Sequence, residues 1–118
     1  MNKPDDAAKM HIGTLEDMGN RFVDAWRRAE RGDAVSETHI TFHDLPALLA
    51  ALTPKRLDLL RYVRHHHVRT VKALAEDLHR DYKNVHKDVE ELTKLGLLAR
   101  TADQVVAPYA GVDVHFAL

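Results

Sequence analysis

The stretch that decides the fold is residues 70–100, TVKALAEDLHRDYKNVHKDVEELTKLGLLAR. Its first part repeats apolar residues at the spacing of one face of a short helix, namely Val71, Leu74, Ala75 and Leu78. Thr70 stands before this face and can cap the helix. After a tight connection at residues 79–81, a second periodic segment covers residues 82–94 and ends at Gly96. The stretch therefore predicts two short helices joined by a tight turn.

The second of these helices, residues 82–94, separates apolar from polar side chains. Its predicted buried side consists of Tyr82, Val85, Val89 and Leu92. At about 100° per residue, the opposite side carries Lys83, Lys87 and Lys94. Asn84 and His86 fall on the flanks. Such a helix can enter a DNA major groove, with lysines at phosphates and short polar side chains at base edges. For this helix alone, a solvated lysine face is the alternative.

The segments on either side complete an ordered pattern. Upstream, a helix capped by Thr53 carries an apolar stripe at Leu57, Leu60 and Val63. Downstream, residues 97–100 and 105–109 flank a polar turn and predict a β-hairpin. Two helices joined by so short a turn pack nearly perpendicular to each other. The order of helix, helix, turn, basic helix and hairpin is that of a winged helix-turn-helix, and it predicts DNA binding far more specifically than the lysine face alone.

The first 52 residues predict a strand–helix–strand arm. Residues 9–13 and 38–43 alternate in polarity, as residues 112–116 do at the other end of the chain. We expect these three strands to form one small sheet, within one protomer or between two. The predicted fold class is thus α+β. The predicted domains are an arm for dimerisation (residues 1–52), a winged helix-turn-helix (residues 53–110) and a C-terminal strand (residues 111–118).

The helix expected between the first two strands has one apolar stripe, which includes Leu15, Met18, Phe22 and Trp26. This stripe can pack against the chain's own helices or against a second copy. A chain this short has difficulty burying all of its amphipathic elements alone. Helix-turn-helix proteins also commonly read two half-sites through two-fold symmetry. We therefore favour a homodimer with these residues at its interface.

Composition limits the class of protein. The 118 residues are 45% hydrophobic and 30% charged, as in ordinary globular domains. No apolar run could span a membrane, the N-terminus lacks a signal-peptide core, and there is no cysteine, so a cytoplasmic location is expected. Residues 53–100 hold 11 basic and 7 acidic side chains, whereas the rest of the chain holds 6 basic and 11 acidic. The basic excess therefore coincides with the predicted DNA-binding region.

Catalysis, metals and cofactors find little support in the sequence. There is no glycine-rich phosphate loop and no nucleophile elbow, and Ser36 is the single serine, so we expect no enzyme activity and no cofactor. The run His65, His66 and His67 invites a metal site. Consecutive helical residues point about 100° apart, however, and cannot all ligate one ion. A solvated helix end beside backbone carbonyl groups is the expected role of this run, and no metal is predicted.

The quoted segments also carry a family resemblance. TPKRLDLLRYV, TVKALAEDL, RDYKNVHKDVEELTKLGLL and VVAPY resemble the winged-helix regulators of the MarR and ArsR type. Together with LEDMGNRFVDAWRRAERGD, they more closely resemble a group of small prokaryotic DNA-binding proteins. Some of these are encoded beside a small toxin and are regarded as antitoxins of the TumE/TumA type. The resemblance covers nearly the whole chain and implies a dimeric regulator that, as an antitoxin, can repress its own operon.

The resemblance implies that residues 82–94 form the recognition helix and residues 102–104 the wing tip. Asp103 makes this tip acidic, unlike the basic tips common in winged helices, which weakens the case for minor-groove insertion. The candidate DNA contacts are Arg69, Arg80, Lys83 and Lys87 for phosphates, Asn84 and His86 for base edges, and Tyr82 for a phosphate through its hydroxyl. A place in the core is the alternative for the Tyr82 ring. The predicted function is a sequence-specific repressor of transcription. The alternative, which can coexist with it, is an antitoxin that mainly neutralises a partner toxin.

Overall fold

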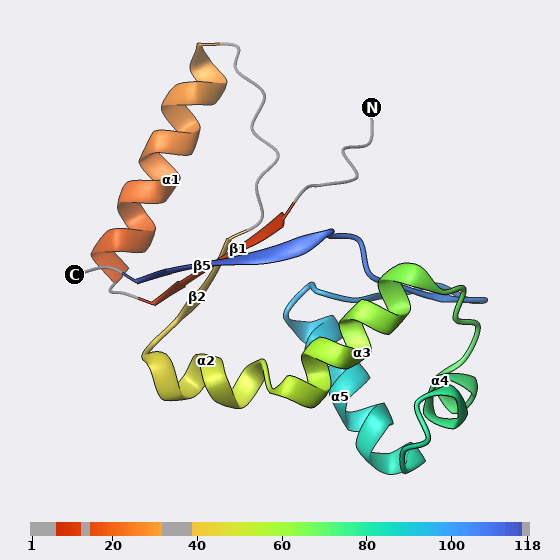
Figure 1. Ribbon diagram of the computed structural model, residues 1–118. Helices are drawn as coiled ribbons and strands as arrows, with labels where there is room; N and C mark the ends of the chain where they lie inside the picture. The colour runs from red at the N-terminus through yellow and green to blue at the C-terminus, as the bar shows by residue number, and fades with distance from the viewer. Residues whose placement is uncertain (1–6, 13–14, 32–38, 117–118) are drawn as a thin grey trace.

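The structure is a computed structural model that describes residues 7–12, 15–31 and 39–116. Figure 1 shows its elements, which follow in the order β1 (Ala7–Ile12), α1 (Leu15–Glu30), β2 (His39–Phe42), α2 (Leu45–Ala51), α3 (Pro54–His65), α4 (Val71–Asp77), α5 (Tyr82–Lys94), β3 (Ala99–Arg100), β4 (Val105–Val106) and β5 (Gly111–Phe116). Helices and two small sheets make this an α+β protein, as the sequence predicts. None of the helices in the described ranges is long and apolar enough to cross a membrane.

The larger sheet joins the two ends of the chain. Its three strands lie in the order β2–β1–β5, and both pairings are parallel. In the register, Met10 of β1 lies between Ile40 of β2 and Val114 of β5. The prediction that the strands near these three residues form one sheet is therefore confirmed, and the sheet forms within a single chain.

Side-chain caps determine where four of the helices begin. Asp44, Thr53 and Thr70 each accept a hydrogen bond from the backbone N–H three residues ahead, over 2.9–3.2 Å. Asp81 caps α5 in the same way through the N–H of Asn84, at 3.3 Å. These bonds satisfy donors that a helix start leaves free. The caps at Thr53 and Thr70 are as predicted, whereas the sequence analysis places Asp81 only in the turn.

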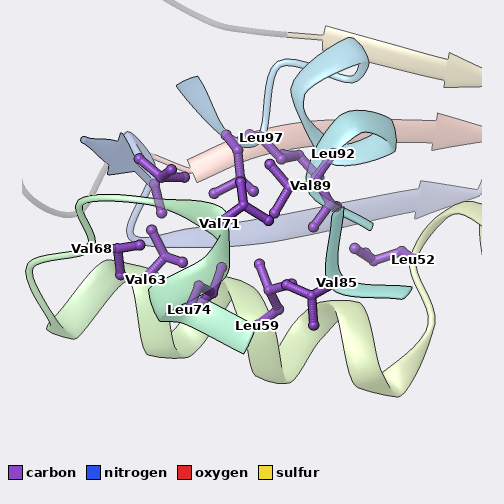
Figure 2. Packing of buried hydrophobic residues seen from close by; sticks show 14 of the residues in the cluster. Leu52, Leu59, Val63, Val68, Val71, Leu74, Val85, Val89, Leu92 and Leu97 are labelled. Carbon is purple, nitrogen blue, oxygen red and sulfur yellow. The ribbon is translucent and has the colours of Figure 1, made fainter. Parts of the chain in front are cut away.

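The core forms where α3, α4 and α5 meet. Figure 2 shows the labelled side chains of these helices converging on one apolar cluster. Five of its larger members are fully buried, namely Leu59, Leu74, Val85, Val89 and Leu92. The predicted stripe of α3 included Leu57 and Leu60, which are only partly buried. Leu59, which was not predicted to face the core, is the fully buried leucine of this helix.

The larger sheet has an apolar face and a polar face. Because side chains alternate along a strand, Ala8 and Met10 of β1 point to one face, and both are fully buried in the same cluster as the helices. Lys9 and His11 point to the other face. Figure 1 shows α1 on this polar side of the sheet and α2–α5 on the apolar side. The arm and the helical part thus share one core.

The hairpin is shorter than predicted. Its strands β3 and β4 have two residues each and pair antiparallel. Leu97 and Leu98 do not extend β3, because their backbone N–H groups bond back to the carbonyl of Leu92, at 3.0 and 3.3 Å. This closure of α5 depends on Gly96, whose φ of 82° suits a residue without a side chain.

Candidate nucleic-acid interface

Helices α4 and α5 pack against each other and are joined by a tight turn. In this turn, the N–H of Arg80 donates to the carbonyl of Ala75 at 3.0 Å, and His79 has a positive φ of 53°. Ala75 is buried with the core-facing residues of α4, Val71 and Leu74. The turn therefore fixes where α5 begins relative to α4.

Helix α5 buries one face and exposes the other. Val85, Val89 and Leu92 are fully buried, as predicted. Tyr82, which the sequence reading placed on the same buried side, is instead 49% exposed. It occupies the first position of the helix, one turn before the core-facing positions begin, so its ring lies at the surface.

The exposed residues of α5 include the main candidates for DNA contact. Lys83, Asn84 and Lys87 are all exposed, in the first two turns of the helix. Lys87 borders a shallow depression that also involves α2, whose Ala47 and Ala50 form part of its wall. Arg69, which is also exposed, precedes α4 rather than lying on α5. The lysine face predicted from the helical spacing is thus present on the surface.

Tyr82 and His86 form a small surface group one turn apart. Their ring centroids are 5.6 Å apart, and His86 Nδ1 lies 3.0 Å from the Oε1 atom of Glu90. His86 is partly buried, so its accessible edge is narrower than that of Asn84. Of the two predicted base-contact residues, Asn84 has the more open side chain.

Arg80 has a different position from the one expected of a phosphate contact. Its Nη2 atom donates to Asp88 Oδ2 at 2.8 Å, while Arg56 Nε donates to Asp88 Oδ1 at 3.0 Å. The three side chains are only 12–19% exposed. Arg56 also donates to the carbonyl of Ala51 at 2.9 Å. This group, the Asp88 clamp, ties α2, α3 and the turn before α5 to α5 itself.

The sequence reading missed the Asp88 clamp, although a signal for it was available. Asp88 lies next to Val85 and Val89 on the helical wheel of α5, at the border of the buried face. An acidic residue at such a border requires a cation from a neighbouring element. The wheel does not identify that cation, because Arg56 is 32 residues away in the chain.

The tip of the hairpin is polar and acidic. Thr101 Oγ1 donates to Asp103 Oδ1 at 3.0 Å, and the N–H of Thr101 donates to the carbonyl of Gln104 at 2.9 Å. Asp103 is exposed, whereas Val105 behind it is buried. The tip therefore presents a carboxylate to the solvent.

The histidine run at the end of α3 is a solvated helix end. His65, His66 and His67 are all exposed. His66 stacks on Tyr62 with ring centroids 4.0 Å apart, and its Nδ1 lies 2.9 Å from the Tyr62 carbonyl oxygen. Within the described ranges, no group of three or more histidine or acidic side chains is arranged to hold a metal ion.

The predicted dimer residues lie on α1. Phe22 and Trp26 are 69% and 61% exposed, so most of each residue is left uncovered. The side chains of Leu15 and Met18 lie outside the part of the chain that the structure describes.

A second polar cluster lies on the polar face of the larger sheet and was not predicted. His11 Nε2 and His39 Nδ1 are 2.7 Å apart and share a hydrogen bond, and the ring centroid of His115 lies 5.8 Å from that of His11. Burial, the nearby Arg21 guanidinium and the neighbouring His39, His115 and Lys9 lower the pKa of His11 from 6.5 to about 4. His11 is therefore neutral at pH 7.

The depressed pKa of His11 predicts how stability depends on pH. Above pH 6.5, His11 is neutral in both the folded and the unfolded chain. Between pH 6.5 and about 4, the unfolded chain takes up this proton and the folded chain does not. The free energy of unfolding should therefore fall as the pH falls, by up to about 1.4 kcal/mol per pH unit from this residue, and level off below pH 4.

Urea denaturation of the wild type and of His11→Gln, at half-unit steps from pH 7.5 to 3.5, measures this contribution. The difference between the two unfolding free energies should change over the stated window, because every other titrating group is common to both proteins. A difference that stays constant with pH would mean that His11 is not held neutral by the fold.

Fold and surface together define an α+β protein that presents an amphipathic helix with exposed lysines. Residues 51–114, which include this helix, match the HVO_A0114 family, and the chain belongs to that family. No curated protein and no solved structure is detectably similar to the chain.

Proposed function

We propose that this chain is a sequence-specific, double-stranded-DNA-binding regulator of transcription that acts as a repressor. The observation that carries the proposal is the two-sided character of α5. It buries Val85, Val89 and Leu92 and exposes Lys83, Asn84 and Lys87 from its first two turns. A helix held by its apolar side, with cations and an amide on the other side, suits the major groove.

The surrounding elements support a winged helix-turn-helix. Helix α4, the tight turn and α5 correspond to the helix-turn-helix, with α5 as the recognition helix, and the β3–β4 hairpin corresponds to the wing. In this proposal α5, together with Arg69 before α4, supplies the contacts and the wing does not, because the carboxylate of Asp103 at the tip is repelled by phosphates. The proposed role entails a cytoplasmic location.

The contact residues have separate roles in this proposal. Lys83, Lys87 and Arg69 neutralise phosphates, and the Tyr82 hydroxyl donates to another. Asn84 and His86 read base edges, since an amide can pair with adenine through two hydrogen bonds. Arg80 has no phosphate role in the proposal, because its guanidinium belongs to the Asp88 clamp. Instead, it holds the start of α5 at the angle that docking requires.

A selection from random-sequence duplexes tests the function. The wild-type chain should enrich one motif, built of two related half-sites about one helical turn apart, as expected of a homodimer. At about 0.15 M salt, the motif should bind at least 100-fold more tightly than a scrambled duplex of the same composition. Enrichment of no motif, or equal affinity for the scrambled duplex, would contradict sequence-specific regulation.

Neutralisation of a toxin is the second candidate function. One observation favours it: Phe22 and Trp26 are large exposed apolar side chains, which are common energetic centres of protein–protein contacts. Co-expression with the product of the neighbouring gene, followed by purification of the intact chain, tests this candidate. A stoichiometric complex that retains DNA binding would show that the two functions coexist.

A further inference from the structure

Helix α1 carries an apolar stripe that the described part of the chain leaves uncovered. Phe22, Val23 and Trp26 are 69%, 45% and 61% exposed, and together with Arg27 and Glu30 they line a shallow surface depression. Exposed aromatic side chains in such a cluster mark an interaction surface more often than scattered apolar residues do. We call these three side chains the α1 stripe.

The polar side of α1, and not the stripe, faces the sheet. Arg21 Nη2 donates to Thr41 Oγ1 of β2 at 2.6 Å, and a polar groove is formed by Asn20, Arg21, Asp24, Arg28 and His39. The helix is therefore held to its own sheet by polar contacts. Figure 1 shows α1 projecting from the sheet. The exposure of the three stripe side chains leaves them accessible to another molecule.

Gly19 supplies an independent observation. It lies inside α1, where a glycine lowers helix stability relative to alanine. A Cβ atom built at Gly19 meets nothing within 4 Å, so no contact in the described chain requires a glycine there. On the helical wheel, Gly19 falls about 20° from Trp26. The stripe therefore has a gap beside its largest side chains.

The position of this gap fits a second copy of α1. The midpoint of Leu15–Glu30 lies between Phe22 and Val23. If two α1 helices pack antiparallel about a two-fold axis at this midpoint, Trp26 of one protomer lies at the same height as Gly19 of the other. The indole ring then faces the position beside the stripe that has no side chain, and Phe22 of each protomer lies at the height of Val23 of the other, next to the axis.

Charge favours the antiparallel direction. On the helical wheel, the charged residues that flank the stripe are Glu16 in the first turn of α1 and Arg27 in its last turn. An antiparallel pair brings the acidic end of each helix beside the basic end of the other, and it also opposes the two helix dipoles. A parallel pair would place like charges side by side.

We propose that a second copy of this chain covers the α1 stripe, with the two α1 helices antiparallel and each Trp26 seated over Gly19 of the other protomer. This deepens the homodimer of the proposed function by naming its surface and geometry. The pairing does not depend on DNA, so it can be tested separately.

The first test fills the gap at Gly19. By light scattering at tens of micromolar, the intact wild type should have twice the 13.4 kDa chain mass. Gly19→Leu should weaken self-association at least 100-fold and leave helix content unchanged or higher, because the new side chain meets open space within the protomer. Gly111→Leu is the matched control, since Gly111 has equally open surroundings outside α1 and should leave the dimer intact.

Trp26 reports the same event without a label, because it is the only tryptophan in the chain. Dilution of the wild type through its dissociation constant should shift the emission of Trp26 to longer wavelength as the indole becomes hydrated. Gly19→Leu should show the long-wavelength emission at all concentrations, and Gly111→Leu should follow the wild type.

Disulfide trapping tests the direction, because the chain has no cysteine of its own. Val23→Cys, near the proposed axis, should form a covalent dimer under mild oxidation. Arg31→Cys should not form one. Residue 31 directly follows the last residue of α1, so an antiparallel pair places its two copies at opposite ends of the helix pair. Equal cross-linking of both variants would overturn the antiparallel arrangement.

Two other outcomes would overturn the proposal. A monomeric wild type at tens of micromolar would mean that the stripe meets a different protein. A dimer unaffected by Gly19→Leu would mean that another surface pairs. The proposed function can fail independently of the α1 pairing. A dimer that passes these tests but binds no DNA would contradict the proposed role in transcription and leave the α1 pairing supported.

Discussion

Asp88→Ala should lower the free energy of unfolding by about 3 kcal/mol or more. The substitution removes the carboxylate that both Arg56 and Arg80 contact, at 3.0 and 2.8 Å. The two guanidinium groups, which are 12% and 19% exposed, would then remain largely buried beside each other without a counter-charge. Breaking one partner of a buried ion pair is costly for this reason, even where the intact pair adds little net stability. Urea denaturation at pH 7 measures the loss.

Two further variants show that the loss comes from buried charge. Asp88→Asn keeps one oxygen acceptor and should lose about half as much stability. Asp58→Ala removes an aspartate whose pair with Arg61 is 3.1 Å long but over 70% exposed, and it should cost no more than about 1 kcal/mol. If Asp58→Ala and Asp88→Ala lowered the free energy of unfolding equally, the Asp88 clamp would be no more stabilising than an exposed surface ion pair.

Local signals in the sequence were sufficient to predict most of the elements. The caps Thr53 and Thr70 and the terminating Gly96 act on their immediate neighbours, so their effects can be predicted from spacing. The apolar side of α5 follows from helical period alone. The strands near Met10, Ile40 and Val114 were predicted from alternation, and their joining in one sheet is borne out by the register.

The features that spacing could not predict depend on contacts between distant segments. Arg56 reaches Asp88 over 32 residues, and His11 pairs with His39 over 28. Tyr82 satisfies the apolar period of α5 but stands one turn before the core begins, so the period alone placed it on the wrong side. The hairpin is short because the N–H groups of Leu97 and Leu98 close α5 instead of pairing with a strand.

The double variant Lys83→Ala/Lys87→Ala should reduce affinity for every DNA sequence to a similar extent. Each phosphate contact contributes a slope of about −0.9 to the dependence of log affinity on log salt. At about 0.1 M salt, the loss of one contact therefore weakens binding about 8-fold, and the loss of both about 60-fold. The salt slope should become shallower by nearly two, because fewer counterions are released. Fluorescence anisotropy with the selected motif and a scrambled duplex, from 50 to 300 mM salt, measures both quantities.

Asn84→Ala should have a different signature, since an amide that reads a base edge contributes to specificity. The substitution should weaken the free energy of binding to the selected motif by about 1–3 kcal/mol. It should change the affinity for scrambled DNA little and leave the salt slope unchanged. Lys94→Ala is the matched control for charge, because Lys94 is an exposed lysine of the same helix in its last turn, 3.5 Å from Glu91. If Lys94→Ala weakens binding as much as Lys83→Ala does, general charge attraction governs affinity. If the double lysine variant is folded and binds the motif with unchanged affinity, α5 is not the element that docks on DNA.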